Sequence, residues 1–179
     1  MKYESIADIY SANSKIRDQL LEVVGGITDA ESATLPAAEK WSIKEIVEHV
    51  AIVESNMLRI CVKLTEAARS TGKQSTGAFS ISPEFGQKLA SVADIKVEAP
   101  ERVRPTGGPN ISESLERISS STRSIEDLRG EIEAFDGSDH TFPHPFFGEL
   151  TAAEWLVVRG GHERRHTMQI ERLLDEIRK

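Results

Sequence analysis

The chain has 179 residues, and 22 Lys and Arg against 29 Asp and Glu give it a formal net charge of −7. This acidic balance argues against a nucleic-acid binder, because binding phosphates requires an excess of clustered basic side chains. A single cysteine excludes an intramolecular disulfide framework and fits a reducing compartment. No apolar run approaches the ~20 residues that span a bilayer, and the N-terminus has no signal-peptide core. We therefore expect one soluble, cytoplasmic domain over residues 1–179, without membrane or nucleic-acid partners.

Four segments predict amphipathic helices, because their apolar side chains recur at intervals of three or four residues. They cover about residues 5–24, 42–64, 110–128 and 151–177. Each of the last three begins with a capping box, in which a Ser, Asn or Thr is followed three residues later by Glu. The starts of these three helices are therefore the best-defined features of the sequence.

The segment between the second and third helices, residues 70–109, is rich in Gly and Pro and predicts at most a short helix over residues 83–93. A connection of about 40 residues is too long for a plain loop in a compact domain. In a helix bundle it would suit a crossover that joins two helices running in the same direction. Because no segment shows convincing strand alternation, we expect an all-α four-helix bundle with this long crossover.

Two histidines, His162 and His166, are four residues apart and therefore project from one face of the last helix, where they could share a divalent metal ion. The segment HERRH also matches the H-E-x-x-H motif of metalloproteases, in which the glutamate is the general base. The elongated form of that motif requires Gly and His at the positions of Gln169 and Arg172. Only thirteen residues follow His166, so a downstream glutamate ligand is also absent, and the protease interpretation is disfavoured.

His49 is the natural candidate for a third ligand, because it lies in the apolar stripe of the second helix beside Ile46 and Val50. An unpaired imidazole there would leave ring nitrogens unsatisfied. Two interpretations remain open: a hydrogen-bonded core histidine, or a ligand that joins His162 and His166. In the second case three neutral imidazoles would form an open site, for which Zn²⁺ or Ni²⁺ is favoured and Fe²⁺ is compatible.

Five further residues could belong to the site or its surroundings. Arg159 and Gln169 each lie about one turn from the histidine pair, where they could contact the ligands or a substrate. Glu163 could act as a base, but it lies ~60–100° around the helix from the histidines. A surface ion-pair partner is an equal alternative, so we assign it no catalytic role. His140 and His144, in a Pro-rich loop, are expected to be surface or packing residues.

Two stretches, LPAAEKWSIKEIVEHVAIVE and HPFFGELTAAEWLVVRGGHERRHTMQIERL, resemble the DinB-like metal-binding four-helix bundles. The similar motifs are W-S-x-x-E-x-x-x-H in the first stretch and H-P-x-x-G-x-L-T followed by H-x-x-x-H-x-x-Q-I in the second. The APERVRPTG segment is also similar, so the resemblance spans essentially the whole chain. It implies a metal triad of His49, His162 and His166, an unusual helix order with a long crossover, and a homodimer formed through helix faces.

The activities of such bundles are diverse, so the resemblance alone does not select one. They include S-transferases that use bacillithiol or mycothiol, a thiol-dependent isomerase and proteins described as metal-dependent hydrolases. Our first hypothesis is an enzyme in which the metal activates a thiol, or less favourably water, against a small electrophilic substrate, with residues 70–109 walling the pocket. Because we expect Cys61 to be a buried small hydrophobe, the thiol would be a diffusible cosubstrate. The alternative is a non-enzymatic, metal-stabilised dimeric protein that binds a ligand or serves in a stress response.

Overall fold

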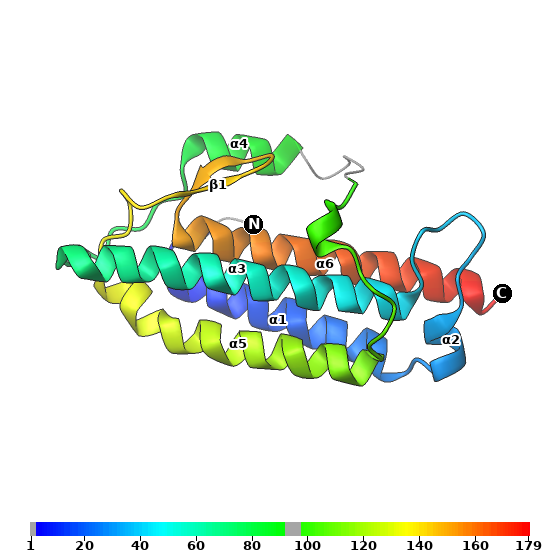
Figure 1. Cartoon of the computed structure of the whole chain (residues 1–179). Helices are drawn as coiled ribbons and strands as arrows, with labels where there is room; N and C mark the ends of the chain where they lie inside the picture. Colours follow the sequence, from blue (N-terminus) through cyan, green and yellow to red (C-terminus); the bar gives the residue numbers. More distant parts are fainter. Residues whose placement is uncertain (1–2, 92–97) are drawn as a thin grey trace.

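The computed structural model of the chain describes residues 3–91 and 98–179. Its four long helices are α1 (Ile6–Gly25), α3 (Ile43–Thr71), α5 (Ile111–Ala134) and α6 (Ala152–Ile177). In Figure 1, α1 and α6 run in one direction, whereas α3 and α5 run in the other. The predicted four-helix bundle is therefore confirmed, and the parallel course of α3 and α5 explains why a long crossover must connect them.

Five short elements complete the fold: α2 (Asp29–Ala33), α4 (Pro83–Ser91), the 3₁₀ turn η1 (Glu101–Val103), and strands β1 (Phe142–His144) and β2 (Gly148–Leu150). The short helix predicted over residues 83–93 is present as α4, and the last two of those residues lie outside the described residues. The antiparallel β1–β2 hairpin was not expected, because strands of three residues are too short for a periodic signal. In Figure 1 the hairpin and α4 lie together over α3 and α6.

The helix ends follow from local sequence. At the start of α3, the backbone N–H and the hydroxyl of Ser42 both donate to the Glu45 carboxylate, at 2.8 and 2.7 Å. At α5 and α6 the predicted capping boxes are reciprocal, so cap and glutamate each satisfy a backbone amide of the other. Helix α3 ends at Gly72, whose φ of 68° lies in the left-handed region that glycine adopts without strain.

The core of the bundle consists of two apolar clusters with buried polar side chains between them. One cluster includes Ile9 and Leu156, and the other includes Leu20, Val50 and Ile170. Along each of α1, α3 and α6, buried charged side chains come between the residues of the two clusters: Arg17, Glu54, Arg159 and Glu163. The bundle is therefore apolar near both ends and polar across its middle.

We call the four buried charged side chains at this level the polar layer: Arg17, Glu54, Arg159 and Glu163, each at most 8% exposed. Arg17 donates to Glu54 at 2.7 Å and also to Glu163, and Arg159 donates to Glu54 at 2.9 Å. Both arginines also donate to the Thr122 hydroxyl. Burial raises the pKa of the Glu163 carboxyl, against the opposing effect of the Arg17 guanidinium. Two positive and two negative groups balance the charge inside the bundle.

Helices α1 and α6 approach closely at Gly160. A Cβ at this position would overlap Asn13 Oδ1 and would lie 3.3 Å from Ile16 Cδ1. The Asn13 amide cannot easily move away, because it is buried and its Nδ2 donates to the Leu156 carbonyl at 3.0 Å. At the neighbouring Gly161, a Cβ would meet no atom of the described chain within 4 Å. The helix contact therefore requires glycine at one of these two positions only.

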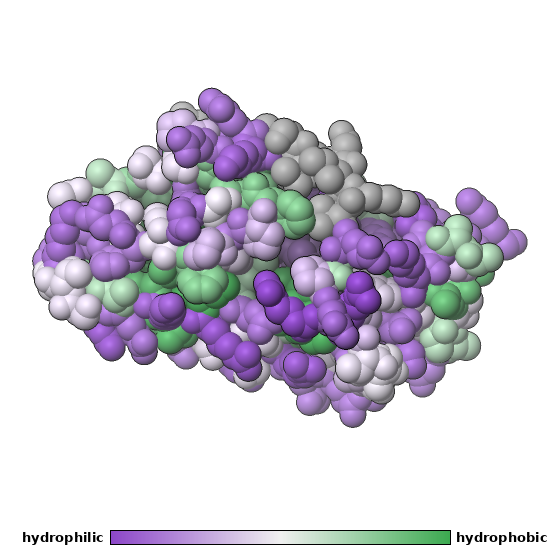
Figure 2. Space-filling model, turned by 45° about the horizontal axis from the view of Figure 1, so that its top comes forward, coloured by the Kyte–Doolittle hydropathy of each residue, from purple (hydrophilic) through white to green (hydrophobic). Residues whose placement is uncertain are grey.

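The surface agrees with the charged composition. Hydrophilic residues cover most of the face that is turned to the viewer in Figure 2, with smaller hydrophobic areas between them. Within residues 3–91 and 98–179, no helix is both long and apolar enough to cross a membrane.

Candidate metal centre

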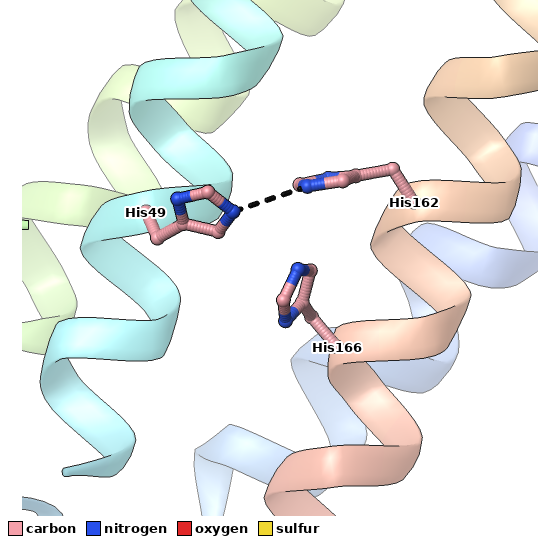
Figure 3. A group of neighbouring side chains, drawn as sticks. All are labelled: His49, His162 and His166. Carbon is pink, nitrogen blue, oxygen red and sulfur yellow. Dashed lines mark hydrogen bonds between the residues drawn. The ribbon is translucent and has the colours of Figure 1, made fainter. Parts of the chain in front are cut away.

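Three histidines converge between α3 and α6. His49 projects from α3 toward His162 and His166, which lie on successive turns of α6 (Figure 3). One ring nitrogen of each histidine belongs to a set of atoms that all lie within 4.8 Å of one another. His49 Nε2 and His162 Nε2 are 3.2 Å apart. The structure thus brings together the three residues that the sequence indicated as ligands, and this set could hold a metal ion.

The second ring nitrogens of two histidines are bonded to acceptors. His49 Nδ1 donates to the Val103 carbonyl of η1 at 2.7 Å, and His166 Nδ1 donates to Gln169 Oε1 at 3.0 Å. Because both partners accept, each Nδ1 carries the proton and each Nε2 has a lone pair, which at His49 accepts from His162 Nε2 at 3.2 Å. His162 Nδ1 is buried and has no hydrogen-bond partner among the described residues. A metal-binding histidine usually donates its second ring N–H to such an acceptor, so the hydrogen bonds of His49 and His166 fit a role as metal ligands.

The imidazoles are held in the neutral form. Burial lowers the pKa of His49, lowers that of His166 to about 4, and lowers that of His162 well below its usual value of 6.5. At His162 the neighbouring His166 and His49 add to the effect. Neutral imidazoles are the form that binds metals, and a set of three nitrogen donors suits Zn²⁺, Ni²⁺ or Fe²⁺.

The family model of the DinB superfamily matches residues 12–170, which include all three histidines. The chain belongs to this superfamily. It is similar to the uncharacterised protein YuaE of Bacillus subtilis (strain 168), with 26% identity over 157 residues, 85% of this chain and 88% of YuaE. The solved structure of TT2238, described as a four-helix bundle protein, is similar with a TM-score of 0.62 and 20% identity, over 94% of this chain and 99% of that one. At this identity the second comparison shows a shared fold alone.

Two residues near the histidines in this DinB bundle do not have the surroundings that we expected. Glu163 is not a surface residue: it is 0% exposed, and both of its carboxylate oxygens accept from Arg17. A glutamate bonded in this way does not face the histidines as the general base of a metalloprotease would. Arg159 likewise contacts Glu54 and Thr122 in the polar layer rather than the histidines. Glu163 is therefore an ion-pair partner, but inside the bundle rather than on its surface, because α6 buries two faces instead of one. Arg159 lies on that second buried face as well.

The loop histidines take the packing and surface positions that the sequence indicated. His144 Nδ1 accepts from the backbone N–H groups of Phe146 and Phe147, at 3.2 and 3.3 Å. Its ring packs 5.1 Å from that of Trp155, and burial lowers its pKa to about 4. His140 lies partly exposed in the loop before β1.

Sequence reasoning did not identify Val103 as part of the site. This residue acts through its backbone carbonyl, so no side-chain pattern could have revealed it. The hydrogen bond does place one residue of the 70–109 crossover against the histidine cluster. The expected contact of Gln169 with the histidine pair is also present.

Proposed function

We propose that His49, His162 and His166 hold a divalent metal ion in this DinB-superfamily protein, with Zn²⁺ or Ni²⁺ favoured and Fe²⁺ as a further candidate. The observation that carries the proposal is the convergence of three neutral imidazoles within 4.8 Å, two of them held by acceptors at Nδ1. Three protein ligands leave a coordination position for a substrate or a nucleophile, which is the arrangement of catalytic rather than structural zinc sites.

We propose further that the protein is an enzyme that transfers a thiol, or less favourably water, to a small electrophilic substrate. A metal in such a site lowers the pKa of a bound thiol or water and so supplies a nucleophile at neutral pH. The chain contributes neutral donors and holds two of them in the required tautomer. Burial raises the pKa of the Cys61 thiol to about 12, which makes it a poor nucleophile. A separate thiol cosubstrate is therefore part of the proposal, as is the homodimer that the family resemblance implies.

Metal binding is tested by titrating metal-free protein with Zn²⁺ or Co²⁺ and measuring the bound ion. We expect about one ion per chain for the wild type, as for a single three-histidine site. The His49→Ala variant should lose tight binding while its circular dichroism remains helical. The matched control is His140→Ala, which removes a partly exposed histidine of the loop before β1. Full metal binding by His49→Ala would remove His49 from the site.

Catalysis is tested with the Zn²⁺- and Ni²⁺-loaded protein, a panel of low-molecular-weight thiols and the electrophile monochlorobimane. We expect the thiol adduct to form faster with the loaded wild type than with the His49→Ala variant treated with the same metal ions. In a Co²⁺-substituted sample, added thiol or azide should change the visible spectrum, because one coordination position is open. A spectrum that neither thiol nor azide changes would favour the non-enzymatic alternative, a metal-stabilised ligand-binding protein.

A further inference from the structure

A short part of the crossover, the 103–107 segment, is bound to α3 at the residue that precedes His49. Glu48 is 2% exposed, and its Oε1 accepts from the backbone N–H and the hydroxyl of Thr106, at 3.0 and 2.7 Å. Its Oε2 accepts from the Gly107 N–H at 2.8 Å. One buried carboxylate therefore receives three hydrogen bonds from two consecutive residues of the crossover.

The path of the segment at this point depends on glycine. Gly107 has a φ of 74°, in the left-handed region, and a Cβ there would lie 3.4 Å from Glu45 Oε1. The Lys44 ammonium donates to the Gly107 carbonyl at 3.2 Å, which adds a further contact to α3. These contacts hold the segment against the first two turns of α3.

The same segment carries the acceptor of His49. Val103, three residues before Thr106, accepts the His49 Nδ1 proton at 2.7 Å. Three residues of chain span at most about 10 Å, so fixing Thr106 confines Val103 to a small region. The η1 turn orients the Val103 carbonyl further, because the Arg104 N–H of the same peptide unit donates to the Glu101 carbonyl at 3.1 Å.

We propose that Glu48 is a positioning residue of the proposed metal centre, on whose existence this inference rests. By holding Thr106 and Gly107, Glu48 keeps the Val103 carbonyl on His49 Nδ1. That hydrogen bond keeps the proton on Nδ1 and directs the Nε2 lone pair toward His162 and His166. Glu48 does not touch the metal position itself, and it acts only through the segment and His49.

The test compares Glu48→Gln with Glu101→Gln. The first variant puts an amide NH₂ group against an N–H donor of the segment, so the segment should loosen. The second removes the same charge from an exposed position in η1, close to the same segment, without changing its contacts to α3. Nitrogen-15 NMR of the metal-free proteins reports the tautomer of His49, and titration with Co²⁺ reports the affinity for metal.

We expect Glu48→Gln to shift His49 away from the Nδ1–H tautomer and to weaken Co²⁺ binding by about 10-fold, the lower end for residues that support a metal ligand. Glu101→Gln should match the wild type in both measurements. Thr106→Val should give a smaller loss because it removes one of the three hydrogen bonds, and Thr106→Ser, which keeps the hydroxyl, should restore wild-type behaviour. If Glu48→Gln does not fold, the two Thr106 variants test the same inference by the same two measurements.

If Glu48→Gln and Thr106→Val match Glu101→Gln in both measurements, the inference is overturned. A loss of Co²⁺ affinity with an unchanged His49 tautomer would also overturn it, because Glu48 would then act by another route. If no protein binds metal but Glu48→Gln still shifts the tautomer, the proposed function fails while the link between Glu48 and His49 is supported.

Discussion

Replacing Gly160 with alanine should destabilise the bundle, whereas the same change at Gly161 should stabilise it. Both residues lie in the interior of α6, so both changes gain about 0.8–1 kcal/mol of helix propensity. Only at Gly160 would the new Cβ collide with Asn13 Oδ1 and press on Ile16. The pair therefore separates the effect of close packing from that of helix propensity.

The size of the effect at Gly160 follows from the contacts of Asn13. To make room, the Asn13 amide must break its hydrogen bond to the Leu156 carbonyl, and a buried amide without a partner costs about 1–3 kcal/mol. After the gain in helix propensity, Gly160→Ala should lose up to about 2 kcal/mol. Because the gain in helix propensity is common to both, the two alanine variants should differ by about 1–3 kcal/mol in free energy of unfolding.

The assay is urea unfolding of the metal-free proteins, followed by far-ultraviolet circular dichroism. A double-mutant cycle adds Asn13→Ala, which removes the side chain that collides. In that background Gly160→Ala should lose its penalty, although the contact with Ile16 leaves less than the full gain in helix propensity. The reasoning is refuted if Gly160→Ala is as stable as Gly161→Ala, or if its effect is the same with and without the Asn13 side chain.

Two further predictions concern buried charge. Glu54→Gln leaves the two arginines of the polar layer with one carboxylate and should cost about 3–5 kcal/mol in urea unfolding, whereas Glu131→Gln, which breaks an exposed ion pair, should cost less than about 1 kcal/mol. Equal losses would show that the layer is not paired as described. Stability of the metal-free protein should also fall as the pH falls from 6.5 to about 4, because the pKa values of His144 and His166 are about 4 in the fold and 6.5 otherwise. The unfolded chain binds protons first in this window, so a urea midpoint that stays constant or rises toward pH 4 would contradict the prediction.

Features that arise from residues close together in the sequence were predictable. The three capping boxes, the stripes of the four helices and the pairing of His162 with His166 all arise within single helices. The crossover was predictable from its length, because few other arrangements of a compact bundle need such a connection. The hairpin was not, since its strands have only three residues each and depend on contacts with α4 and α6.

The polar layer shows why periodicity and residue type can disagree. Glu54 follows Val50 by four residues and precedes Met57 by three, so its spacing is that of a core position. Its charge nevertheless argues against burial. The compensating arginine, Arg17, comes from α1, 37 residues earlier in the chain. No pattern within α3 could reveal that partner, and without it a buried carboxylate would be too costly.

The two buried faces of α6 have a consequence for how the HERRH segment can vary among related chains. His162 and His166 face α3, while Glu163 between them faces Arg17 of α1, so folding and the proposed metal site constrain adjacent positions independently. By contrast, the side chains at positions 164 and 165 are exposed. We therefore expect homologous sequences to diverge first at these two arginines. Position 163 should change only together with position 17, even in a homologue that lacks the three histidines.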